Sequence, residues 1–289
     1  MAFSEGINGY FDVGAQLPDY LKRLTRSFFE KTREEKQSIV TVEQFERRRD
    51  ALRSAFLESI GGLPEEKTPL KPVCTGELER DTYVIRKIVY QSLPGFYVTA
   101  NLYVPKDIPG KVPVVIMACG HAELAKAYPP YQKVCIDLVR NGIAVLAVDP
   151  VSQGERMQYY DPSIGRSLVR WHAEHTYIGL QCDLMGSSVI RYFIWDLIRA
   201  VDYLCTLPEM DHERIGITGN SGGGLQTLFM MMVEPRIHAA VPCTYVTSRE
   251  SYMRTGQPQD GEQIIYGAIR DGLDYDDYVT MFAPKTAMI

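Results

Sequence analysis

The sequence predicts an α/β fold in which a mostly parallel sheet carries helices on both faces. Two continuous apolar runs, residues 112–120 and 142–149, are the first observation. Strands of this kind are buried on both sides, which is typical of parallel sheets. The second observation is that segments with helical spacing of apolar residues lie between and after these runs. Strands that alternate with helices indicate an α/β class.

The N-terminal part, residues 1–72, is predicted to be a helical extension ahead of the main domain at 73–289. Helical patterns cover residues 17–60, and Thr41 with Gln44 forms a capping box at the start of the second helix. Phe45, Leu52 and Phe56 can share one face of that helix, which glycines stop at 61–62. We expect this extension to serve packing, with a lid or a dimer contact as the alternative.

The remaining elements follow in order along the chain. Residues 82–104 predict an antiparallel hairpin that turns at Pro94 and Gly95, and residues 150–185 predict a long irregular stretch of the kind that is often functional. An amphipathic helix is expected at 187–207, a strand at 214–219, a helix at 222–233 and a strand at 238–246. A polar helical segment at 260–277 and the beginning of a strand at 282–289 complete the prediction.

Composition excludes several classes of function. The chain has 289 residues and a net charge of −5, which argues against nucleic acid or an anionic membrane as a partner. Its six cysteines are scattered and are expected to be reduced thiols. The N-terminus lacks the pattern of a signal peptide, and no run of about 18 apolar residues occurs. We therefore expect a cytoplasmic protein without a membrane partner.

The clearest chemical motif is G-x-S-x-G at residues 219–223, which places Ser221 between an apolar strand and a helical run. This context is typical of a nucleophile held on a sharp strand-to-helix turn. Gly222 would then present its N–H group to a developing oxyanion at a helix N-terminus. A serine that only caps a helix, or a phosphate-binding turn, is the alternative, but no lysine follows at the spacing of a P-loop.

An acyl-transfer site also needs a second oxyanion donor in the loop after an earlier parallel strand. That loop contains Gly120 and His121, and we assign the donor to the His121 backbone N–H. A role for the His121 side chain as the catalytic base is less favoured, because this residue belongs to the oxyanion side of the turn.

With these motifs placed, the chain resembles the α/β-hydrolase superfamily, and within it the acetyl xylan esterase and cephalosporin-C deacetylase-like carbohydrate esterases. The matching stretches include VPVVIMACGHA, AVDPVSQGER and, most specifically, WDLIRAVDYLCTLPEMDHERIGITGNSGGG. The resemblance covers about residues 82–289. It implies an α/β-hydrolase fold and a Ser221 nucleophile that needs no metal or organic cofactor. One departure is that Cys119 and Gly120 stand where many members have His-Gly.

The resemblance also implies a triad in the order serine, acid, histidine. After Ser221 the sequence has one histidine, His238, which comes directly before a strand and so is in the wrong place to face Ser221. We therefore expect the base, and with it the last strands of the fold, to lie beyond Ile289. Glu250 is a candidate acid inside the chain. His172 and His175 are alternative bases, although a structural histidine bonded to backbone is the favoured interpretation.

The sequence thus predicts a serine esterase that acts on acetyl or other short-chain esters, on carbohydrates in particular. The residues assigned to the site are Ser221, Gly222, His121 and Glu250, and the only partners expected are a small-molecule or carbohydrate ester and a second copy of the chain. A serine peptidase of the prolyl-oligopeptidase kind and a non-catalytic hydrolase-like fragment are the alternatives. Against the peptidase, the chain contains no repeats that would form a propeller.

Overall fold

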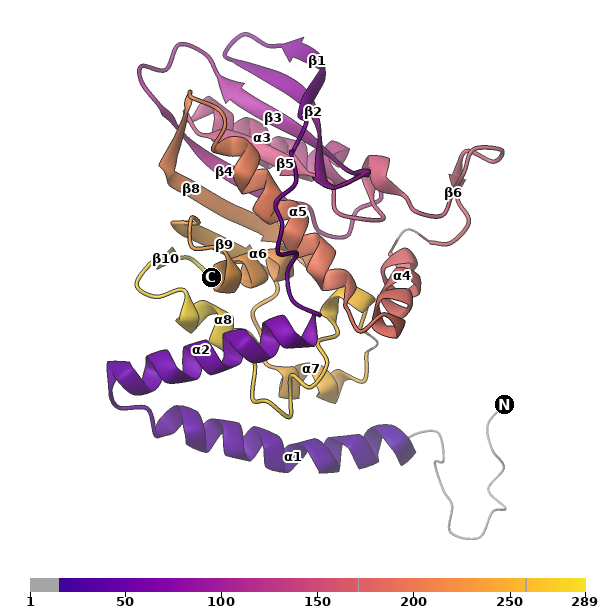
Figure 1. Cartoon of the computed structure of the whole chain (residues 1–289), viewed down its shortest axis with the longest axis vertical. Coiled ribbons are helices and arrows are strands. Elements are labelled where there is room, and N and C mark those ends of the chain that lie inside the picture. The colour runs from indigo at the N-terminus through magenta and orange to yellow at the C-terminus, as the bar shows by residue number, and fades with distance from the viewer. Residues whose placement is uncertain (1–15, 171, 258) are drawn as a thin grey trace.

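The computed structural model describes residues 16–170, 172–257 and 259–289. The N-terminal residues from which the absence of a signal peptide is predicted lie outside this part. Two antiparallel helices, α1 (Gln16–Gln37) and α2 (Val42–Ser59), form the N-terminal extension, and α1 lies on the outside of α2 (Figure 1). The capping box at Thr41 and Gln44 is present. No helix in the described residues is long and apolar enough to cross a membrane.

One sheet of eight strands runs through the molecule, in the order β1-β2-β3-β5-β4-β8-β9-β10. Neighbouring strands from β1 to β5 in this order pair antiparallel. The strands from β5 to β10 in this order pair parallel. The strands are β1 (Val73–Glu79), β2 (Tyr83–Leu93), β3 (Phe96–Pro105), β4 (Val112–Ala118), β5 (Ala144–Val148), β8 (Met210–Asn220), β9 (Ala239–Cys243) and β10 (Thr286–Ala287). The predicted hairpin, parallel strands and final strand are confirmed, and β1 is an additional edge strand.

Helices cover both faces of this sheet, because successive strand residues point to opposite sides. On β4, Ile116 packs in the core that includes helix α5 (Val189–Leu204) and helix α6 (Gly222–Val233). Its neighbour Met117 packs on the other side, in the core that includes α3 (Pro129–Arg140). The α/β class predicted from the continuous apolar strands is therefore confirmed.

The structures predicted for two segments are wrong. The stretch 150–185 contains helix α4 (Ala173–Leu184) and a small hairpin of β6 (Tyr160–Asp161) and β7 (Arg166–Ser167). Helix α4 buries Glu174 and His175 instead of an apolar stripe, so its sequence lacks apolar periodicity. The predicted helical segment 260–277 is mostly turns, because Gly267 and Gly272 adopt positive φ angles. Its helical parts are η4 (Gly261–Gln263) and the start of α8 (Tyr275–Met281).

Two more helical segments lie near the ends of the sheet strands. These are the 3-10 helices η2 (Ala125–Ala127) and η3 (Gly154–Arg156). A short helix, α7 (Arg249–Thr255), follows β9 and lies near α1. Because β4, β8 and β9 are parallel, their carboxyl ends meet at one edge of the sheet, where ligands of open α/β sheets bind.

Candidate functional site

Ser221 occupies the sharp turn between β8 and α6. Its backbone has φ 56° and ψ −120°, a strained conformation for a residue with a side chain. The Ser221 N–H donates to the Cys243 carbonyl oxygen at 3.1 Å and to the Thr244 hydroxyl at 3.0 Å, and both acceptors come from the end of β9. These two hydrogen bonds to the end of β9 therefore hold the strained turn in place. The geometry is that of a nucleophile elbow.

The glycines around Ser221 are required by close backbone packing. A Cβ at Gly219 would lie 2.5 Å from the Ala118 carbonyl oxygen, at the end of β4. A Cβ at Gly223 would lie 2.9 Å from the Gly120 backbone nitrogen, and one at Gly120 would overlap the Asn220 carbonyl oxygen. The backbones of the loop after β4 and the turn after β8 are thus in van der Waals contact. Only glycine, which has no Cβ, fits at these positions.

The two predicted oxyanion donors lie side by side. The position that a Cβ of Gly222 would occupy is 3.8 Å from the His121 backbone nitrogen and 3.5 Å from the His121 ring. Gly222 is the first residue of α6, and the N–H groups of a first helical turn have no acceptor within the helix. The structure therefore brings Ser221, Gly222 and His121 together.

The His121 side chain belongs to a cluster that the sequence did not reveal. Its Nε2 atom lies 2.6 Å from a carboxylate oxygen of Glu262 and 3.2 Å from His175 Nδ1. The other Glu262 oxygen lies 3.0 Å from His175 Nδ1, and the side chains of His175 and Glu262 are 1% and 3% exposed. This cluster joins the loop after β4, helix α4 and helix η4 directly beside the Ser221 turn.

Electrostatic interactions within this cluster favour the charged forms of His121 and Glu262. Burial by itself lowers the pKa of His121, but its contact with Glu262 outweighs this and raises that pKa above the ordinary value. Burial would raise the pKa of Glu262, whereas His175 and His121 lower it far below its ordinary range. Glu262 is therefore a buried carboxylate that stays ionised because two imidazoles surround it.

Glu262 was missed because it lies in the segment expected to be a polar helix. The local signal was nevertheless present, since Asp260 and Gln263 form a capping box around η4. Such a box places the intervening residues in a short helical turn, and Glu262 points from this turn into the interior. His175 was expected to be a structural histidine bonded to backbone, and its Nε2 does lie 3.0 Å from the Val151 carbonyl oxygen.

Glu250, the candidate acid, lies on α7. Its two carboxylate oxygens pair with Arg33 of α1 and Arg254 of α7, each at 2.7 Å. Burial would raise the pKa of Glu250, but these arginines lower it below its ordinary value. The carboxylate thus links α7 to the N-terminal extension. This geometry does not favour a role in a triad, which stays a prediction.

Asp149 follows the end of β5 and fixes the turn that contains η3. It accepts hydrogen bonds from the Thr99 hydroxyl at 2.6 Å and from the Lys126 backbone N–H at 3.0 Å, and it also pairs with the Lys126 ammonium group. A Cβ at Gly154 would lie 2.6 Å from this carboxylate. Asp149 is completely buried and serves the fold.

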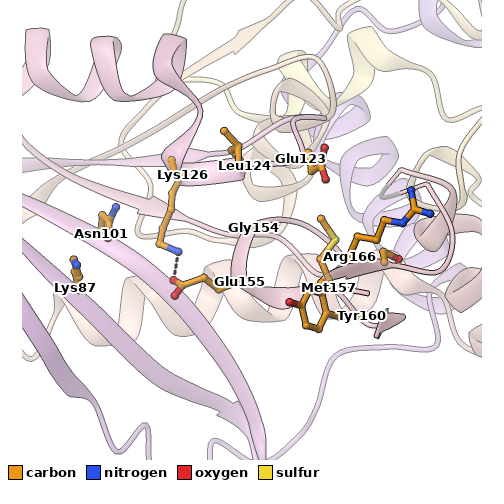
Figure 2. A pocket seen from close by; sticks show the side chains of 13 residues that line it. Lys87, Asn101, Glu123, Leu124, Lys126, Gly154, Glu155, Met157, Tyr160 and Arg166 are labelled. Atoms are coloured by element: carbon orange, nitrogen blue, oxygen red, sulfur yellow. Dashed lines mark hydrogen bonds and ion pairs between the residues drawn. The ribbon is translucent and has the colours of Figure 1, made fainter. Parts of the chain in front are cut away.

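A cavity of about 630 Å³ lies on the outer side of this turn. Lys126 and Glu155 point toward each other at one side of it, 2.5 Å apart, and Tyr160, Met157 and Arg166 line the other (Figure 2). Glu123, two residues after His121, also lines it. Side chains of both charges line the cavity together with apolar ones, and neither Ser221 nor His121 is part of its lining.

The strand order and the strained serine turn after β8 define an α/β-hydrolase fold. The family model of acetyl xylan esterase (AXE1) matches residues 67–263, and the chain belongs to this family of esterases. The resemblance drawn from the sequence motifs is confirmed. The cytoplasmic location and the self-association expected from the sequence stay predictions.

Among curated relatives, an uncharacterized protein of Pseudomonas aeruginosa is 26% identical over 160 residues, which make up 55% of this chain and 36% of that protein. A Bacillus subtilis protein named as a candidate hydrolase, YtaP, is 22% identical over 65% of this chain and 62% of its own length. The chain therefore spans about a third and about three fifths of these two relatives.

Among solved structures, a Bacteroides fragilis protein named as a candidate acetyl xylan esterase is similar over 98% of this chain and 76% of its own. Its TM-score is 0.75 at 19% sequence identity. This likeness shows the fold that the two proteins share.

Proposed function

We propose that this protein is a serine esterase that hydrolyses acetyl or other short-chain esters of carbohydrates through an acyl-enzyme on Ser221. The observation that carries the proposal is the strained backbone of Ser221 at the end of β8. Strain of this kind persists only where surrounding structure imposes it, and it clusters at active sites. Membership of the acetyl xylan esterase family supports the reaction class.

In the proposed reaction the Ser221 hydroxyl attacks the ester carbonyl while a histidine base takes its proton. The carbonyl oxygen becomes an oxyanion that accepts hydrogen bonds from the backbone N–H groups of Gly222 and His121, two residues in close contact. Collapse of the tetrahedral intermediate expels the sugar hydroxyl, which receives the proton from the histidine. Water then attacks the acyl-enzyme by the same route, releases the carboxylic acid and restores Ser221.

His121 and His175 are poor candidates for this base. Nε2 of His121 faces Glu262, and its Nδ1 lies 3.6 Å from Asp260. Nδ1 of His175 faces the same Glu262, and its Nε2 faces the Val151 carbonyl. Each ring nitrogen therefore already has a neighbouring polar partner other than Ser221. That the base lies beyond Ile289 stays a prediction from the triad order of the family.

Carbohydrate as the alcohol component is supported by the relatives and by the cavity beside the η3 turn. Tyr160 offers an aromatic face there, and Asn101, Lys87 and Arg166 offer hydrogen-bond donors. Aromatic faces with a few polar groups are the usual lining of sugar sites. The Glu123 segment connects this cavity to the proposed oxyanion loop.

The test is hydrolysis of p-nitrophenyl acetate by the full-length protein, with any segment that follows Ile289, and by its Ser221→Ala and Ser54→Ala variants. The adducts of a fluorophosphonate probe are mapped by mass spectrometry. Ser54 is an exposed serine of α2 and serves as the matched control. We expect labelling at Ser221, and loss of at least about 10³-fold in rate for Ser221→Ala alone. Equal rates for both variants, or neither hydrolysis nor labelling of the wild type, would overturn the proposal.

A further inference from the structure

Three side chains with metal-binding atoms converge beside the oxyanion loop. One nitrogen each from His121 and His175 and the oxygens of Glu262 lie within 4.8 Å of one another. The individual separations are 2.6 Å, 3.0 Å and 3.2 Å. Two imidazoles and one carboxylate form the ligand set of several catalytic zinc sites.

The hydrogen bond of His175 to backbone directs its other nitrogen toward this centre. A carbonyl oxygen can only accept, so the His175 Nε2 atom, 3.0 Å from the Val151 carbonyl, carries the hydrogen. In the neutral ring Nδ1 then presents a lone pair, and this atom faces the Glu262 carboxylate. Two electron-rich atoms that meet in a buried place need a cation between them, either a proton or a metal ion.

His121 also has an oxygen behind its outer nitrogen, at a longer distance. Its Nε2 atom faces the centre, while Nδ1 lies 3.6 Å from a carboxylate oxygen of Asp260. Each histidine therefore has an oxygen behind the nitrogen that points away from the centre, at hydrogen-bond distance for His175 and at ion-pair distance for His121. Metal-binding histidines almost always have such outer partners, which fix the tautomer and the ring orientation.

We propose that His121 Nε2, His175 Nδ1 and the Glu262 carboxylate bind one divalent transition-metal ion, with zinc the ion that best fits this ligand set. Ligands bound to one zinc ion at 2.0–2.2 Å lie about 3.4 Å apart. The observed separations are somewhat shorter, so small outward side-chain rotations would admit the ion as protons leave. His175 and Glu262 close two sides of the site, and His121, 18% exposed, marks the side that faces solvent.

An ion at this position would fix the proposed oxyanion loop. The ligands come from the loop after β4, from α4 and from η4, segments that are far apart in the chain. His121 contributes its ring to the ion and its peptide N–H to the space in front of Ser221, next to Gly222. The site departs from the expectation that no metal is needed. Metal binding can be tested without any esterase reaction, so the two proposals can fail separately.

The experiment measures metal content and metal binding. The purified wild-type chain is analysed for metals by mass spectrometry, and the chelated chain is titrated with Zn²⁺ by calorimetry and with Co²⁺ by visible absorption. We expect one equivalent of zinc or iron as purified, or one Zn²⁺ bound per chelated chain, with the absorption of four-coordinate Co²⁺. A hundredfold excess of Zn²⁺ over its Kd should raise the folding equilibrium constant about 100-fold.

Glu262→Gln and His175→Ala should lose this binding, whereas His238→Ala should keep it. His238 is a matched control because it precedes β9, at the opposite end of that strand from the Ser221 turn. The wild-type titration does not depend on whether the variants fold. If the wild-type chain bound neither Zn²⁺ nor Co²⁺ at metal concentrations on the order of 1 mM, the proposal would be overturned. Equal losses of metal binding in all three variants would overturn it as well. Protons would then be the only cations of the cluster.

Discussion

Gly120 and Asn220 touch so closely that a Cβ on Gly120 would overlap the Asn220 carbonyl oxygen. The same Cβ would lie 3.0 Å from the Gly223 nitrogen and 2.9 Å from the Tyr131 hydroxyl. Two segments a hundred residues apart in the sequence thus form one backbone contact, and this contact holds the loop of His121 against the turn of Ser221.

Gly120→Ala should therefore destabilise the protein and displace the oxyanion loop. We expect a loss in free energy of unfolding on the order of 3 kcal/mol, because backbone atoms cannot yield as a flexible side chain would. Urea denaturation measures the effect. Gly76→Ala is the control, since a Cβ there meets nothing closer than 4.0 Å. If Gly120→Ala lost no more unfolding free energy than Gly76→Ala, the close contact between Gly120 and Asn220 would be contradicted.

Ser221→Gly should be more stable than Ser221→Ala, although both lack the nucleophile. Alanine keeps the cost of φ 56° and ψ −120°, whereas glycine adopts such angles at little cost. We expect a difference of about 1 kcal/mol in favour of glycine, even though glycine normally destabilises folded chains. Thermal and urea denaturation of the two variants provide the comparison. A glycine variant less stable than the alanine variant would show that the turn is not strained.

Asp196 and Arg156 form a buried ion pair between α5 and the η3 turn, 2.7 Å apart and each 3% exposed. Asp196→Ala should cost about 3–5 kcal/mol because it leaves a buried guanidinium without its partner. The double variant Arg156→Met with Asp196→Leu should recover most of this loss, since apolar replacement of a buried pair is often neutral. Urea denaturation of the wild type, Asp196→Ala and the double variant measures both effects.

A more exposed ion pair provides the control for that comparison. Arg214 and Asp211 lie 2.6 Å apart with side chains 58% and 22% exposed, so Asp211→Ala should change stability by at most about 1 kcal/mol. If Asp196→Ala cost no more than Asp211→Ala, the buried pair would have no special role in holding the η3 turn.

Asp202 should stabilise the fold in a pH-dependent manner. It pairs with Lys67 at 2.9 Å, Arg199 at 2.5 Å and Arg236 at 2.6 Å. Burial would raise the pKa of Asp202, but hydrogen bonds from Lys67 and Arg236 lower it below the ordinary value. A carboxyl group with a lowered pKa in the folded state stabilises above its unfolded pKa, near 3.9, and loses this effect as the pH falls further.

Asp202→Asn should thus cost about 1–2 kcal/mol at pH 7 and pH 5, and clearly less at pH 3. Urea denaturation at the three pH values measures the difference from wild type. Asp50→Asn, which removes a carboxylate with a 69% exposed side chain, should change little at any pH. A cost for Asp202→Asn that is constant from pH 7 to pH 3 would rule out the charge as its cause.

The parts of the fold that could be predicted are those whose sequence signal is local. The hairpin at Pro94 and Gly95, the parallel strands and the turn at Ser221 each have their signal within a few consecutive residues. Helix α4 could not be predicted in this way, since it buries Glu174 and His175. Its polar side pairs with residues elsewhere in the chain, so it shows no apolar stripe.

By itself the sequence determined the α/β class, the position of Ser221 and the need for glycines around it, because strand burial and turn sterics act over short stretches of chain. Only the tertiary structure placed Glu262 between His121 and His175 and bound Glu250 to Arg33. These contacts join segments that are far apart in the chain, and a buried charge can be recognised only when the opposite charges that surround it are known.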